Sequence, residues 1–142
     1  MTEVRPDRTL GSGHDEFWRW CAKGQLRLPR CDHCGHLSWP VTLNCDCCGG
    51  DQFSWQRMSG TGKILSWCTF ERDYYQGQLQ IPWDTILVEL DEGPLFLSNP
   101  LGFTWRDIEP DMSVRLAFLP AEDSAGRFEL PVFERTIEPD CD

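Results

Sequence analysis

The stretches Cys31-Asp32-His33-Cys34 and Cys45-Asp46-Cys47-Cys48 decide how the N-terminal part of this chain folds. Each is a C-x2-C pair followed by a glycine, and ten residues separate the two. The glycine permits the positive φ angle that such a turn often needs, and the two-residue spacer lets both sulfurs of one turn face the same ion. Zinc takes four ligands at the corners of a tetrahedron. The pattern therefore predicts one structural Zn²⁺ on Cys31, Cys34, Cys45 and Cys48, in a closed site without a position for catalytic water.

Two other uses of these cysteines fit the same spacing. Two disulfides could form in a secreted protein, and a C-x2-C pair can act as a redox motif. Residues 1–12 are polar and charged and lack the apolar core of a secretory signal. A redox pair is also less expected twice in close succession, so we favour zinc.

The second motif contains an extra cysteine. Pairing Cys45 with Cys47 leaves one spacer residue, whereas pairing it with Cys48 restores the two-residue spacer of the first motif. Because four cysteines complete the site, we expect Cys47, His33 and His36 to be bystanders.

Three further cysteines have no near partner in the sequence. We expect Cys21 and Cys68 to be small buried thiols and Cys141 to be a thiol of a mobile tail.

The composition suits one compact domain with a small appended module, since the chain has 142 residues with 7 Trp and 8 Phe for a core. No run of about 18 apolar residues is present, so we expect no membrane span. The net charge of −10 disfavours binding to a phosphate backbone. Reduced thiols and the lack of a signal or anchor predict a cytoplasmic protein.

The first third of the chain reads as an arm, a helix and a short strand. Residues 1–13 resemble a disordered or loosely docked arm. Residues 14–23 favour a helix, because Phe17, Trp20 and Cys21 follow helical spacing; Ser12 or Asp15 could cap it and Gly24 could end it. Trp18 lies off that apolar stripe and could cover either a partner or the chain's own ribbon. Residues 25–30 alternate as a short strand would.

The rest of the chain predicts a small antiparallel barrel. Five strands are expected, at residues 63–70, 84–90, 95–98, 113–119 and 127–134. The first three form a meander, and a long connection over 99–112 precedes the fourth, as in a five-stranded OB fold; a sandwich is the alternative. We therefore divide the chain into an arm and helix (1–29), a zinc ribbon (30–56), an OB fold (57–135) and an acidic tail (136–142).

A series of motifs in order resembles the DUF35 family, whose members combine a rubredoxin-like zinc ribbon with an OB fold. The resemblance covers residues 14–134. The matching pieces are Phe17-Trp18, Gly24-Gln25-Leu26, the two cysteine motifs with their glycines, Pro40, Trp55, Ser59-Gly60-Thr61-Gly62-Lys63-Ile64, Pro82, Leu97-Ser98-Asn99, Met112-Ser113-Val114 and Leu130-Pro131-Val132-Phe133. Cys47 departs from the family pattern.

The resemblance implies a non-catalytic subunit in a hetero-oligomer. Partners in the family are thiolase-like or aldolase-like acyl-CoA enzymes, including acyltransferases and retro-aldolases that cleave steroid side-chain CoA thioesters. Other relatives pair with MaoC-like acyl-CoA hydratases, and acyl-CoA can lie at the shared interface. The chain itself shows no nucleophile with a recognisable base and no phosphate-binding loop. A single-stranded nucleic-acid module is the rival interpretation, because OB folds often bind single strands.

The connection over residues 73–83 carries several large apolar groups, which interfaces favour and which could equally cover the barrel's own mouth. A second aromatic pair lies in the long connection. The candidate partner or substrate contacts are Trp18, Tyr74, Tyr75, Trp83, Phe103 and Trp105.

Overall fold

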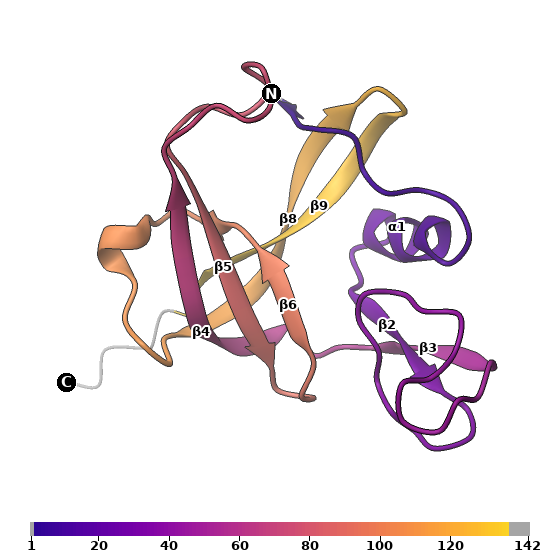
Figure 1. Cartoon of the computed structure of the whole chain (residues 1–142). Helices are drawn as coiled ribbons and strands as arrows, with labels where there is room; N and C mark the ends of the chain where they lie inside the picture. The colour runs from indigo at the N-terminus through magenta and orange to yellow at the C-terminus, as the bar shows by residue number, and fades with distance from the viewer. Residues whose placement is uncertain (1, 137–142) are drawn as a thin grey trace.

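A computed structural model describes residues 2–136 as one helix beside a β barrel, with a two-stranded ribbon below the helix (Figure 1). The elements in chain order are β1 (Glu3–Val4), α1 (His14–Ala22), β2 (Arg27–Cys31), β3 (Phe53–Arg57), β4 (Thr61–Phe70), β5 (Trp83–Leu90), β6 (Leu95–Ser98), β7 (Pro100–Leu101), the 3-10 helix η1 (Trp105–Asp107), β8 (Ser113–Asp123) and β9 (Gly126–Arg135). The expected mostly-β class with an N-terminal helix is confirmed.

The barrel has the strand order of an OB fold. Strands β4, β5 and β6 form the expected antiparallel meander, β4 also pairs with β8, and β8 pairs with β9. Only Asn99 separates β6 from β7, and β7 runs parallel to β9, with the Phe133 N–H donating to the Asn99 carbonyl at 3.2 Å. This pairing joins the two ends of the sheet, so the sandwich alternative is wrong.

Strand β4 can pair with two neighbours because it bends. The register with β5 shifts between Ile64 and Ser66, which marks a β-bulge, and bulges bend a strand and increase its twist. The N-terminal half of β4 then reaches β8, where Gly62 faces Val114.

The ribbon is built from β2 and β3, which pair in antiparallel fashion from Arg27 opposite Arg57 to Cys31 opposite Phe53. Strand β2 was expected, whereas β3 was not. Its side chains are half-buried or exposed, so no clear two-residue alternation of apolar residues marks it.

Helix α1 begins at His14 as predicted, but neither Ser12 nor Asp15 caps it. Gly13 takes the N-cap position, and no side chain caps the helix. The Asp15 carboxylate instead accepts a hydrogen bond from the Gly11 N–H at 2.9 Å. Gly24, with φ of 73°, ends the helix as expected.

One continuous core joins the helix, the ribbon and the barrel. The Phe17 ring lies 4.4 Å from the ring centroid of Trp39 in the ribbon and 6.3 Å from that of Phe96 in β6. Trp39 and Phe96 also stack on each other at 5.4 Å. The apolar face of α1 therefore closes one side of the barrel, and the ribbon packs against the same aromatic group.

The N-terminal arm is docked along the barrel, and the expectation of a disordered or loose arm is wrong. Strand β1 runs parallel to the end of β8, and the Arg5 N–H donates to the Glu122 carbonyl at 2.9 Å. The Arg8 side chain is paired with Asp123 at 2.7 Å. These contacts join residues more than 110 positions apart, which explains why the local sequence did not reveal them.

The cysteines outside the two motifs differ in exposure. Cys21 is fully buried as expected, and burial raises the pKa of its thiol to about 12, so the thiol is unreactive. Cys68 is exposed on β4, so the prediction of a buried thiol is wrong there; the bulge precedes it in the strand and changes which side chains point outward. Cys141 lies outside the described residues. Within residues 2–136, the helices are too short or too polar to cross a membrane.

Candidate metal centre and barrel-mouth cavity

The two cysteine motifs form turns of the same geometry. In the first, the Gly35 N–H donates to the Cys31 carbonyl at 2.8 Å, and in the second the Gly49 N–H donates to the Cys45 carbonyl at 2.8 Å. Gly35 and Gly49 have φ angles of 81° and 78°, the left-handed conformation that glycine adopts without strain. Cys45 therefore pairs with Cys48, because Gly49 follows Cys48 just as Gly35 follows Cys34 in the first turn.

The four thiols of these turns converge on one point. The sulfurs of Cys31 and Cys48 lie 3.5 Å apart, and those of Cys34 and Cys45 lie 3.6 Å apart. All four sulfurs lie within 4.8 Å of one another. Zinc–sulfur bonds of about 2.3 Å in a tetrahedron place sulfurs roughly 3.8 Å apart. The donor set and its dimensions therefore fit a tetrahedral metal ion.

Backbone N–H groups favour the thiolate of Cys31, whereas the pKa values of the Cys34 and Cys48 thiols are raised. The Cys34 N–H, ahead of smaller contributions, lowers the pKa of the Cys31 thiol to about 6. At Cys34 the His36 N–H lowers the pKa, but burial and the contacts to the other three sulfurs raise it to about 12. Several thiolates cannot gather here without a compensating charge, which is what a divalent cation supplies.

The neighbouring candidates stay outside the cluster. Cys47 is exposed and contributes only its backbone N–H, which donates to the Cys45 sulfur at 3.4 Å. His33 and His36 are exposed and do not belong to the group of four.

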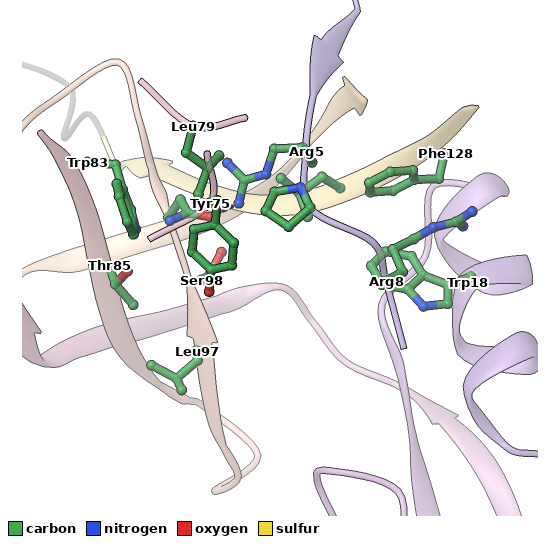
Figure 2. A pocket seen from close by; sticks show the side chains of 13 residues that line it. Arg5, Arg8, Trp18, Tyr75, Leu79, Trp83, Thr85, Leu97, Ser98 and Phe128 are labelled. Atoms are coloured by element: carbon green, nitrogen blue, oxygen red, sulfur yellow. Dashed lines mark hydrogen bonds between the residues drawn. The ribbon is translucent and has the colours of Figure 1, made fainter. Parts of the chain in front are cut away.

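A cavity of about 340 Å³ opens at the mouth of the barrel, between the arm, α1 and the β4–β5 connection (Figure 2). Its walls come from four parts of the chain: Arg5, Pro6 and Arg8 of the arm; Trp18 of α1; Tyr75, Leu79, Trp83 and Thr85 around the connection; and Leu97, Ser98, Asn99, Phe128 and Leu130 of the barrel. The strands β5 and β6 and the connections beside them form the surface with which OB folds commonly bind ligands.

The structure brings three of the six predicted contact residues, Trp18, Tyr75 and Trp83, to this cavity. Leu79 is buried, so the 73–83 connection does cover part of the barrel mouth. Tyr74 is 63% exposed and is not one of the residues that line the cavity.

The remaining two predicted contact residues differ in their exposure to solvent. Phe103 is buried in the core, whereas Trp105 is 46% exposed in η1. The Trp105 N–H donates to the Asp84 carboxylate at 3.0 Å, which holds η1 next to Trp83.

Two arginines and a phenylalanine of the cavity were not predicted. Arg5 and Arg8 belong to the arm whose docking was missed, and Phe128 was expected only as a strand residue. The alternation of apolar residues in the last strand is the one signal that marks Phe128 as inward-facing.

Within residues 2–136, no side-chain hydrogen bond joins a histidine to a serine, a cysteine or a carboxylate.

Comparison with known proteins shows what the chain is similar to. A family model described as "ChsH2, C-terminal OB-fold domain" matches residues 55–119. The solved structure "Ltp2-ChsH2(DUF35) aldolase" superposes with a TM-score of 0.80 at 26% identity, covering 92% of this chain and 100% of that one. A "DUF35 domain-containing scaffold protein" of Pyrococcus furiosus is 28% identical over 101 residues, 70% of this chain and 74% of that protein. These matches confirm the resemblance to DUF35 proteins.

A longer relative extends this comparison. A "Probable enoyl-CoA hydratase alpha subunit" of Thermomonospora curvata is 30% identical over 142 residues, which cover 96% of this chain. The chain spans 43% of the length of that subunit.

Proposed function

We propose that this chain is a non-catalytic DUF35 subunit that docks to a thiolase-like acyl-CoA enzyme and supports its activity. One observation carries the proposal: the whole of the matched chain in the "Ltp2-ChsH2(DUF35) aldolase" structure superposes on 92% of this chain. The scaffold name of the Pyrococcus furiosus relative points the same way.

The metal has a structural part in this proposal. One Zn²⁺ on Cys31, Cys34, Cys45 and Cys48 would hold the two turns of the ribbon. All four ligands come from the protein, so the ion would have no open position for a substrate or water. The residues then support docking by fixing the shape of the ribbon beside α1.

A second partner class is favoured by the Thermomonospora curvata relative. Its name describes a hydratase subunit, and it is 30% identical to nearly the whole chain. The chain could therefore support a MaoC-like acyl-CoA hydratase instead of a thiolase-like enzyme.

The test is reconstitution with each partner class. The chain is co-expressed separately with a thiolase-like protein and with a hydratase-like protein from the same genome, and complexes are measured by size-exclusion chromatography with light scattering. We expect one stable complex whose acyl-CoA activity exceeds that of the enzyme alone, and no turnover by the isolated chain. Failure of both pairs to associate, or turnover by the chain alone, would overturn the proposal.

A further inference from the structure

The charged residues of the barrel-mouth cavity are basic, although the chain as a whole carries a net negative charge. The sequence has 23 acidic and 13 basic residues, yet the charged residues among the described cavity walls are Arg5 and Arg8, without an aspartate or glutamate. Arg5 also borders a smaller cavity of about 170 Å³, and the nearby carboxylates of Glu3 and Asp84 line that one instead. The charged groups of the larger cavity are thus both guanidinium groups, and they lie beside apolar side chains and the neutral polar residues Thr85, Ser98 and Asn99.

Arg8 is a fixed part of the cavity wall. Its guanidinium is paired with the Asp123 carboxylate at 2.7 Å, and both side chains are almost fully buried. It also lies 4.2 Å from the ring centroid of Phe128 and 5.2 Å from that of Trp18. The charge of Arg8 is therefore balanced by the protein, and its position is set by aromatic packing.

Arg5 is less completely paired. Its side chain is 17% exposed and donates to the Asn99 side-chain oxygen at 2.9 Å and, more weakly, to the Glu3 carboxylate at 3.3 Å. Glu3 is itself 43% exposed, so water weakens that ion pair. A guanidinium offers five N–H donors in a planar fork, so Arg5 keeps donors for an anionic group. In Figure 2 it lies between the Tyr75 side of the cavity and the side formed by Phe128 and Trp18.

The opposite side of the cavity is apolar. Tyr75 and Trp83 lie 5.7 Å apart between ring centroids, and Leu79 and Leu97 complete this wall. Phe70 stacks on Trp83 with 4.8 Å between the ring centroids, which holds Trp83 in place.

We propose that this cavity binds a small organic anion, with its apolar body against Tyr75, Trp83 and Leu97 and its oxyanion on Arg5. The fork of an arginine matches a carboxylate or a phosphate. A volume of about 340 Å³ lies within the range of small-molecule sites, roughly 300–1,000 Å³. The site belongs to the isolated chain, so it stands whether or not the proposed docking function holds.

Isothermal titration calorimetry on the full chain tests the proposal with three probes that share a naphthyl ring and differ in their polar group. These are 1-naphthoate, 1-naphthyl phosphate and the neutral 1-naphthalenemethanol. We expect at least one anion to bind about tenfold more tightly than the alcohol, since hydrogen bonds to a charged group are worth more than neutral ones. The two anions show whether the site prefers a carboxylate or a phosphate. Equal binding of all three probes, or no binding of either anion at millimolar concentration, would overturn the proposal.

Variants then place the anion. Arg5→Gln should weaken anion binding about tenfold, and the exposed Arg115→Gln on β8 is the matched control that should leave it unchanged. Leu97 is 66% exposed, so Leu97→Glu and Leu97→Lys should both fold. Because their charges are opposite, Leu97→Glu should weaken anion binding relative to Leu97→Lys. If Arg5→Gln fails to fold, the affinities of the two Leu97 variants for the anion still test the site. Equal affinities of Leu97→Glu and Leu97→Lys would contradict it.

Discussion

The Arg8 guanidinium lies 2.7 Å from the Asp123 carboxylate, and this pair fastens the N-terminal arm to the hairpin of β8 and β9. The Asp123 side chain is 1% exposed. It also accepts hydrogen bonds from the backbone N–H groups of Arg8 and Ala125, both at 3.0 Å. The side-chain hydrogen bond from Arg8 is the main reason that the pKa of Asp123 falls from 3.8 to about 2.

This lowered pKa gives a pH-dependent contribution to stability. Because the folded-state pKa lies below the unfolded value, the contribution is present above about pH 4 and is lost as the pH falls towards 2. Asp123→Asn should therefore lower the free energy of unfolding by about 2 kcal/mol at neutral pH, and the difference from the wild type should shrink below pH 4. Thermal and urea melts across pH 2–7 measure it.

The control is the exposed pair of Arg115 and Glu134, whose nitrogen and oxygen are also 2.7 Å apart. Glu134→Gln should cost less than about 1 kcal/mol, since water screens exposed ion pairs. A difference between wild type and Asp123→Asn that stays constant down to pH 2 would show that the ion pair is not its cause.

The metal assignment predicts a clear difference between neighbouring cysteines. Elemental analysis of the purified chain should give about one zinc per molecule. Cys48→Ser should lose the metal because it removes one of the four converging sulfurs, whereas Cys47→Ser should keep it. Retention by Cys48→Ser together with loss by Cys47→Ser would refute the pairing.

Removal of the metal should loosen the ribbon before the barrel. No large apolar side chain of residues 30–56 is fully buried, so much of the folding free energy of the ribbon would come from the metal. Chelation in mild denaturant should increase hydrogen exchange of backbone amides over residues 30–53 before it does so in β4 and β5, as measured by mass spectrometry. Simultaneous loss of protection everywhere would mean that the core shared by Phe17, Trp39 and Phe96 makes the two parts one cooperative unit.

The sequence predicted the local features of this fold well. The spacing of the cysteines specifies two turns within 18 residues, and the glycines after them have the positive φ that was expected. The meander of β4, β5 and β6 was likewise visible as strands separated by turn residues.

The features that were missed depend on contacts between distant residues. Arg8 and Asp123 are 115 positions apart, and neither neighbourhood indicates a partner. Trp18, Tyr75 and Trp83 were each singled out as aromatic candidates, but only the closed barrel and the docked arm show that they share one cavity. Burial separated Phe103 from Trp105, although the two looked equivalent in the sequence.

The last prediction concerns the surface that meets the proposed partner. Tyr74 and Trp105 are exposed aromatic side chains near Trp83. Tyr74 packs against Phe70, which stacks on Trp83, and the Trp105 N–H donates to the carboxylate of Asp84, the residue after Trp83. Tyr74→Ala combined with Trp105→Ala should weaken assembly by about 2 kcal/mol or more, about thirtyfold in affinity, because aromatic anchors dominate interfaces. The melting temperature of the isolated variant should stay unchanged, since neither ring is buried.

Two matched variants decide how this result is interpreted. Leu43→Ala removes an apolar side chain that is 84% exposed on the ribbon, and it should leave both assembly and the melt unchanged if docking uses the barrel side. Trp83→Ala should lower the melting temperature, because Trp83 stacks on Phe70 with an angle of 12° between the rings. Normal assembly of the Tyr74 and Trp105 variant, measured with the partner found by reconstitution, would exclude this surface. Weak assembly of Leu43→Ala would instead place the interface on the ribbon.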